Sequence, residues 1–135
     1  MNNQNIAKSD TQRKKILLVD DEEEALVQLT NLLKRANFEV VSTSKGKEAL
    51  ALASNTKPDL IILDMLLPDM PGAEISRKLS ADPALSAIPV LFLTGLNTKE
   101  DEIIMKEKAG VYHLLAKPIT REELLEAIHK IIPSA

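Results

Sequence analysis

The sequence contains no cysteine and few aromatic residues, and each shortage excludes a class of protein. With no cysteine among 135 residues, disulfides, thiolate metal sites and cysteine nucleophiles are excluded. Aromatic residues make up 2% of the chain, so a core must be built from aliphatic side chains. No apolar run approaches the ~18 residues that a membrane span needs, and the N-terminus lacks the apolar segment of a signal peptide. We therefore expect a cytoplasmic protein that does not enter a membrane.

Acidic and basic residues nearly balance, with a small excess of negative charge. The formal net charge is −3 at pH 7. This balance argues against direct binding of nucleic acid, because the phosphate backbone attracts basic surfaces. Hydrophobic residues at 44% and charged residues at 27% are typical of a globular protein, and 135 residues suit a single domain.

The chain divides into a short polar start and one continuous patterned region. Residues 1–14 carry few large apolar groups and are interpreted as a flexible N-terminal tail, whereas residues 15–133 are expected to form one domain. Three short apolar runs are typical of strands buried on both faces of a sheet: Ile16–Val19, Leu60–Leu63 and Val90–Leu93. A more polar strand is expected at a sheet edge over residues 38–42, and a fifth strand over residues 111–116.

Helical spacing of apolar residues fills the intervals between these runs. The predicted helices cover residues 22–36, 45–54, 72–79, 98–108 and a last segment that begins at Thr120. Glu123 follows Thr120 at the spacing of a capping box. Strands that alternate with helices predict a parallel sheet covered by helices on both faces. In such sheets, the functional site lies at the carboxyl ends of the strands.

The predicted strands end in side chains that can carry chemistry. Asp20 and Asp21 follow the first strand, and Asp64 follows the third. Thr94 ends the fourth strand, and Lys117 follows the fifth. Each of these residues has an ordinary interpretation as a helix cap, a turn residue or a solvated charge. Because the carboxyl ends of parallel strands share one edge of the sheet, we expect all five side chains to lie close together.

Three neighbouring carboxylates favour a particular chemistry. They repel one another, and a hard divalent cation such as Mg²⁺ relieves that repulsion through oxygen ligands. A carboxylate can also attack phosphorus to form an aspartyl phosphate. Phosphoryl transfer needs mainly positioning and neutralisation of charge, which a cation, a lysine and a hydroxyl group would supply.

The ordered set resembles the receiver domains of bacterial response regulators. The resemblance rests on Asp20–Asp21, the segment Asp64–Gly72, Thr94 and Lys117–Pro118, and it covers about Lys14 to Pro133. Any one motif is weak, whereas the set in this order and spacing is specific. The resemblance implies a doubly wound, flavodoxin-like α/β fold with a five-stranded parallel sheet in the order 2-1-3-4-5.

The resemblance also implies roles at the acidic end of the sheet. Asp64 corresponds to the residue that accepts a phosphoryl group. Asp21 would bind Mg²⁺ directly and Asp20 largely through water, while the backbone carbonyl of Leu66 would be a further ligand. Such a protein would catalyse its own phosphorylation and dephosphorylation without being an enzyme in the usual sense.

Signalling roles follow from the same resemblance. Lys117 would pair with the phosphoryl oxygens, and Thr94 would turn inward to hydrogen-bond them. The peptide bond between Lys117 and Pro118 is expected to be cis. The implied partners are a histidine kinase or phosphotransfer protein and a downstream protein target, with a phosphorylation-dependent dimer as a further candidate. With no room after Pro133 for an output domain, we expect output by protein contact unless the chain is part of a longer one.

The sequence departs from the family pattern at three positions. Many receivers carry an aromatic residue three positions before the lysine, where this chain has Leu114, which we expect to be ordinary packing. Leu66 and Leu96 are apolar where side chains border the path of the hydrolytic water, so slow loss of the phosphoryl group is predicted. His113 and His129 are isolated and are expected to be surface or packing residues.

Three other functions remain alternatives. A phosphohydrolase with an aspartate nucleophile would carry a second acid at Leu66. A flavodoxin-like nucleotide or flavin binder would need a Gly- or Ser/Thr-rich loop after the first strand, where Asp21–Glu24 would repel phosphate. A pseudo-receiver that only binds other proteins would not need the intact acidic set.

Overall fold

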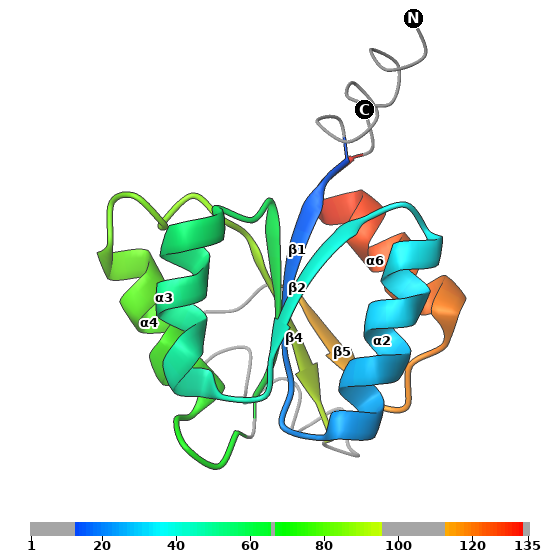
Figure 1. The fold of residues 1–135 in the computed structure, drawn as a ribbon, viewed down its shortest axis with the longest axis horizontal. Coiled ribbons are helices and arrows are strands. Elements are labelled where there is room, and N and C mark those ends of the chain that lie inside the picture. Colours follow the sequence, from blue (N-terminus) through cyan, green and yellow to red (C-terminus); the bar gives the residue numbers. More distant parts are fainter. Residues whose placement is uncertain (1–12, 66, 96–112, 134–135) are drawn as a thin grey trace, which may run out of the picture.

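The fold is a five-stranded parallel sheet between two layers of helices (Figure 1). The computed structural model describes residues 13–65, 67–95 and 113–133. The strands are β1 (Lys15–Val19), β2 (Glu39–Thr43), β3 (Leu60–Asp64), β4 (Val90–Thr94) and β5 (Leu114–Ala116). The helices are α2 (Glu23–Arg35), α3 (Gly46–Thr56), α4 (Gly72–Ala81) and α6 (Arg121–Ile131). The order β2-β1-β3-β4-β5, with every neighbouring pair parallel, confirms the predicted fold class and strand order.

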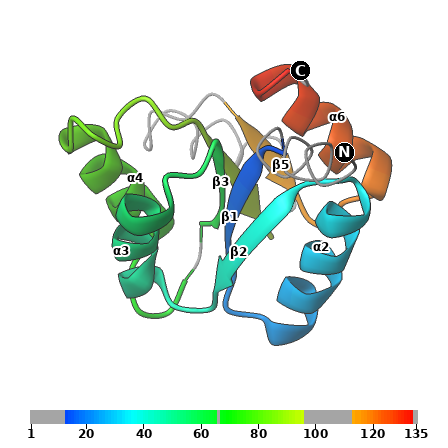
Figure 2. The same cartoon turned by 45° about the horizontal axis from the view of Figure 1, so that its top comes forward.

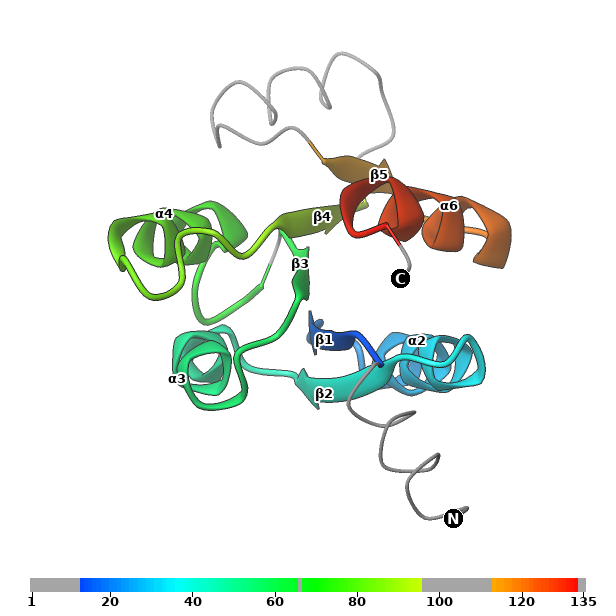
Figure 3. The same cartoon turned by 90° about the horizontal axis from the view of Figure 1, so that it is seen from above.

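Helices cover both faces of the sheet, as predicted. Helices α3 and α4 lie together on one side, and α2 and α6 lie on the other (Figures 2 and 3). Alternate side chains of β1 enter different layers, with Leu17 packing toward α3 and α4 and Leu18 toward α2 and α6. The helix predicted over residues 98–108 and residues 1–12 of the tail predicted over residues 1–14 lie outside the described residues.

Burial of the strands follows their sequence pattern. Every residue of β3 is buried, as are the last four residues of β1 and of β4. This confirms that the continuous apolar runs are strands covered on both faces. Strand β2, whose predicted polar character placed it at an edge, is the first strand of the sheet and is only partly buried.

The second strand begins one residue later than predicted, because Phe38 closes the preceding helix. Asn37 adopts a left-handed conformation with φ 74°. Its backbone N–H donates to the Lys34 carbonyl at 3.0 Å, and the Phe38 N–H donates to the Leu33 carbonyl at 3.0 Å. These two bonds form a Schellman ending, which turns Phe38 inward to pack with Leu33.

Other element ends differ from the predictions by a few residues. Helix α3 extends to Thr56 instead of residue 54 and is followed by Lys57 in the left-handed conformation, with φ 49°. Helix α4 continues to Ala81, beyond the predicted residue 79. The last helix has the predicted capping box between Thr120 and Glu123.

Gly72 allows the start of α4 to press against the end of β3. Its backbone N–H donates to the Met65 carbonyl at 3.0 Å. A Cβ atom at Gly72 would lie 2.8 Å from the Asp64 carbonyl oxygen and 2.9 Å from the Met65 Cα. Both neighbours are backbone atoms, which cannot rotate away as a side chain could.

We therefore expect Gly72→Ala to lower the free energy of unfolding by about 1–3 kcal/mol, the usual cost of overpacking. Urea denaturation followed by circular dichroism measures this change. Gly95→Ala is the matched control, because no described atom lies within 4 Å of a Cβ built there. Equal effects of the two substitutions would contradict the steric explanation.

None of the described helices is both long enough and apolar enough to cross a membrane.

Candidate functional site

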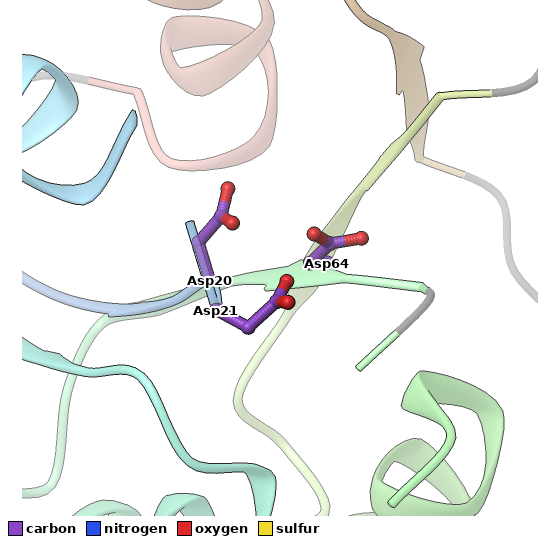
Figure 4. A group of neighbouring side chains, drawn as sticks. All are labelled: Asp20, Asp21 and Asp64. Carbon is purple, nitrogen blue, oxygen red and sulfur yellow. The ribbon is translucent and has the colours of Figure 1, made fainter. Parts of the chain in front are cut away.

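Three aspartates meet at the carboxyl ends of β1 and β3. Asp20 and Asp21 follow β1 directly, and Asp64 is the last residue of β3. A carboxylate oxygen from each lies within 4.8 Å of the other two, around one shared space (Figure 4). Asp20 is fully buried and Asp64 is 6% exposed, whereas Asp21 is open to solvent. The structure thus brings together the three acids that the sequence placed at separate strand ends.

Lys117 follows the edge strand β5 and contacts two of these three acids. Its Nζ lies 2.9 Å from Asp20 Oδ2 and 3.3 Å from Asp64 Oδ2. The backbone places it there, because the Lys117 N–H donates to the Thr94 carbonyl at 2.7 Å and extends the pairing of β4 with β5. The peptide bond to Pro118 is cis, as predicted.

The charge of Lys117 is stabilised by its acidic neighbours. Burial disfavours the ammonium, but the hydrogen bond to Asp20 and the negative charges of Asp64 and Asp20 outweigh it, so the pKa of Lys117 is raised above its usual value. The side chain remains a cation at neutral pH and holds two carboxylates close to each other.

Asp20 both shapes the turn before α2 and contacts the lysine of the site. One carboxylate oxygen accepts a hydrogen bond from the Glu22 N–H at 3.0 Å and shapes the turn into α2. The other oxygen accepts from Lys117. A buried carboxylate must satisfy its oxygen atoms, and these two donors do so.

Glu22 contacts Lys117 in this site, although the sequence predicted it as the first residue of a helix and not as a partner of a lysine. Its Oε1 lies 3.4 Å from Lys117 Nζ, and its side chain is 66% exposed. The signal was present as an unbroken acidic run after the first strand. Nothing in that run showed which acid would face a lysine 95 residues later in the chain.

Thr94 lies in the sheet beside the acidic cluster, and Leu114 begins the neighbouring strand β5. Thr94 ends β4, is fully buried and pairs in register with Ala116, one residue before Lys117. Leu114 is partly buried and packs with the cluster that contains Phe92, which agrees with its expected packing role. Leu66 and Leu96 lie outside the described residues, so the predictions made for them stay predictions.

The two histidines lie apart from the acids. His113 is exposed at the start of β5. His129 lies on α6 with its ring centroid 6.4 Å from that of Phe38, which agrees with a packing role. Within the described residues, the potential metal-binding cluster consists of Asp20, Asp21 and Asp64.

The residues at this edge suit a hard divalent cation. Three carboxylates offer oxygen atoms close enough to share an ion, and Glu22 adds a further negative charge nearby. Lys117 neutralises only part of this charge. An acidic site of this composition favours Mg²⁺ or Ca²⁺ over metals that prefer nitrogen or sulfur ligands.

Comparison with known proteins gives a consistent family. The family model of the response regulator receiver domain matches residues 16–129. Protein PilH of Pseudomonas aeruginosa is 32% identical over 118 residues, which are 87% of this chain and 97% of PilH. The polar-differentiation response regulator DivK of Brucella anthropi is 32% identical over 122 residues, which are 90% of this chain and 98% of DivK.

A solved structure agrees with the sequence comparisons. The chemotaxis response regulator CheY4 of Vibrio cholerae matches with a TM-score of 0.81 at 29% identity, covering 89% of this chain and 99% of that chain. Family model, relatives and fold therefore agree over the same region, and this chain belongs to the response regulator receiver domain family.

Proposed function

We propose that Asp64 accepts a phosphoryl group from a histidine of a partner kinase or phosphotransfer protein. The observation that carries the proposal is the position of its carboxylate, which lies close to the acids after β1 and to the ammonium of Lys117. Asp64 is 6% exposed and still shares its space with an exposed acid, Asp21. A nucleophile needs such a position, which is accessible from one side and held from the others.

The proposed step is an in-line displacement at phosphorus. An oxygen of the Asp64 carboxylate forms a new P–O bond while the P–N bond to the donor imidazole breaks, and the imidazole leaves with the electron pair. Catalysis of this step consists mainly of placing the reacting groups and balancing the charge on the phosphoryl oxygens. Lys117 can supply a positive charge to these oxygens, since it already lies 3.3 Å from Asp64.

Mg²⁺ is the proposed cofactor. Asp20, Asp21, Asp64 and the backbone carbonyl of Leu66 would hold it. When bound, Mg²⁺ would neutralise negative charge on the transferred group. The short separation of the three carboxylates supports the assignment, because without a cation Lys117 offsets their mutual repulsion only in part.

Thr94 is proposed to pass on the signal. Thr94 ends β4 one residue after Leu93, which pairs with Asp64. On its other side it pairs with Ala116, the residue before Lys117. An inward turn of its hydroxyl toward the phosphoryl group would shift the segment that follows it and change the surface read by a downstream protein. Leu114 cannot add the aromatic movement found in many receivers, so Thr94 would carry the change without it.

Phosphorylation with a small donor tests the proposal. Incubation with acetyl phosphate and Mg²⁺ is expected to add the mass of one phosphoryl group, located at Asp64 by peptide mass spectrometry after reduction with borohydride. Asp64→Asn should abolish the gain. Asp59→Asn is the control, because Asp59 accepts a hydrogen bond from the Lys15 N–H at the opposite end of the sheet.

The alternative function predicts a different outcome. If the wild-type protein gains no mass under conditions in which Mg²⁺ binds, the chain acts as a pseudo-receiver, a module that binds partners without phosphorylation. A gain at another residue would contradict the assignment of Asp64 while leaving phosphorylation itself intact.

A further inference from the structure

Asp69, in the loop between β3 and α4, caps a helix that is distant in the sequence. One of its carboxylate oxygens accepts from the Gly46 N–H at 3.0 Å and the other from the Lys47 N–H at 2.9 Å. These are the first two residues of α3. Lys45, which precedes them, makes no side-chain cap in the part of the chain that the structure describes. The loop after Asp64 thus supplies the cap that α3 does not provide locally.

The capping interaction favours the charged form of Asp69. The hydrogen bond from Lys47 contributes most and, together with that from Gly46, outweighs the opposing effect of burial, so the pKa of Asp69 is lowered. The positive end of the α3 dipole acts in the same direction. The carboxylate therefore remains ionised and bonded to α3 at neutral pH.

The start of α3 is in turn tied to the strand that carries the acidic pair. Thr43 Oγ1 donates to Glu48 Oε1 at 2.6 Å and accepts from the Lys45 N–H at 3.1 Å. The Thr43 carbonyl accepts from the Asp20 N–H at 3.2 Å. A continuous chain of hydrogen bonds and covalent links thus connects Asp69, through the start of α3, with Asp20.

The loop that carries Asp69 is held at its α4 end and in its middle. At the α4 end, Gly72 bonds to the Met65 carbonyl and leaves no room for a Cβ atom. In the middle, Leu67 is buried, and a Cβ atom on Gly46 would lie 3.1 Å from both Leu67 Cδ1 and Asp69 Oδ1. The start of α3 and this loop are therefore packed closely enough for a shift in one to move the other.

We propose that Asp69 is a positioning residue that fixes the backbone after Asp64 relative to the Asp20–Asp21 pair. The inference rests on the proposed function, because its effect would be to keep the two halves of the acidic site at a distance that one cation can bridge. Asp69 itself would contact neither the cation nor the phosphoryl group. It would act only through the loop and the start of α3.

Loss of this contact should weaken Mg²⁺ binding more than it lowers the free energy of unfolding. For Asp69→Ala we expect the Kd for Mg²⁺ to rise about tenfold, the lower end of the range for residues that orient metal ligands. Asp69→Asn keeps an oxygen that can accept from α3, so its Kd should lie between those of the wild type and the alanine variant. At saturating Mg²⁺, the rate of phosphorylation should return to within about twofold of the wild type, since the reacting groups are unchanged.

The experiment compares two aspartates with the same kind of contact at opposite ends of the sheet. Asp59 Oδ2 accepts from the Lys15 N–H at 2.8 Å, so Asp59→Ala also removes a long-range carboxylate-to-backbone bond, but far from the acids. Binding of MgCl₂ is measured by calorimetry for both alanine variants and for Asp69→Asn, and the free energy of unfolding is measured in parallel. The binding readout does not depend on phosphorylation.

The outcomes separate this inference from the proposed function. A weaker Mg²⁺ affinity in Asp69→Ala, with partial recovery in Asp69→Asn and none of this loss in Asp59→Ala, supports positioning. Equal Mg²⁺ affinities would overturn it and leave Asp69 as a helix cap alone. If Asp69→Ala does not fold, Asp69→Asn decides between the outcomes. This variant lacks the charge and one acceptor oxygen, so a wild-type Mg²⁺ affinity in it would count against positioning. Absence of phosphorylation in the wild type would defeat the proposed function instead.

Discussion

Replacing Lys117 with methionine is expected to slow phosphorylation of Asp64 by about 100-fold, the usual effect of removing one group that stabilises developing charge in a transition state. The same variant should bind Mg²⁺ about tenfold more tightly, because a positive charge that competes for the carboxylates is gone. The structure motivates both directions, since Lys117 Nζ lies 2.9 Å from Asp20 and 3.3 Å from Asp64. The variant is therefore expected to combine slower phosphorylation with tighter Mg²⁺ binding.

The stability of the Lys117→Met variant should also depend on Mg²⁺. Asp20 is fully buried and would lose its ammonium partner, which destabilises a protein because a buried charge is left uncompensated. The proposed Mg²⁺ site is assembled only in the folded state, so adding Mg²⁺ should restore part of the lost free energy of unfolding. Urea denaturation with and without MgCl₂ measures this recovery.

Lys130→Met is the matched control. Lys130 lies on α6 with a side chain that is 76% exposed, and its Nζ is 4.0 Å from Glu126 Oε1. An exposed pair of this kind contributes little, so phosphorylation rate and Mg²⁺ affinity should both stay at wild-type values. If Lys117→Met were phosphorylated within about twofold of the wild-type rate, the proposed role of its ammonium would be wrong.

Phe92→Ala is expected to lower the free energy of unfolding by about 3–5 kcal/mol, which is a large share of the stability of an ordinary domain. Phe92 lies in the middle of β4, is 1% exposed and belongs to the cluster between the sheet and the helices α3 and α4. It pairs in register with Leu63 on one side and Leu114 on the other. The truncated side chain would leave a cavity beneath the residues that precede Asp64.

Thermal or urea denaturation measures this effect, and Val27→Ala is the control. Val27 lies on α2 with 59% of its surface exposed, so its truncation should change the free energy of unfolding by less than about 0.5 kcal/mol. Comparable losses in the two variants would show that burial in the Phe92 cluster does not dominate the stability of this sheet.

Elements defined by local pattern were predictable from the sequence. The runs Ile16–Val19 and Leu60–Leu63 favoured strands buried on two faces, because they are short and no polar residue interrupts them to meet solvent, and the structure confirms this. The capping box of α6 was also visible, since its two partners are three residues apart. The convergence of Asp20 and Asp64 followed from a general property of parallel sheets and needed no side-chain coordinates.

Contacts between distant segments were not predictable in the same way. The sequence indicated that Glu22 lies near the start of a helix but not that it faces Lys117. It gave no sign that Asp69 caps α3, because the donors lie 22 and 23 residues earlier in the chain. The inward turn of Phe38 also depended on how α2 ends against the sheet.

By itself, the sequence determined the α/β class, the edge of the sheet at which the acids gather and the residue types available there, because periodicity and strand-end position are local properties of the chain. The tertiary structure alone decided which acids share Lys117, how deeply Asp20 is buried and which loop is tied to which helix. Those features depend on register and packing between segments far apart in the chain. A shift of one residue in the register between two strands would change which side chains meet, while every local sequence pattern stayed the same.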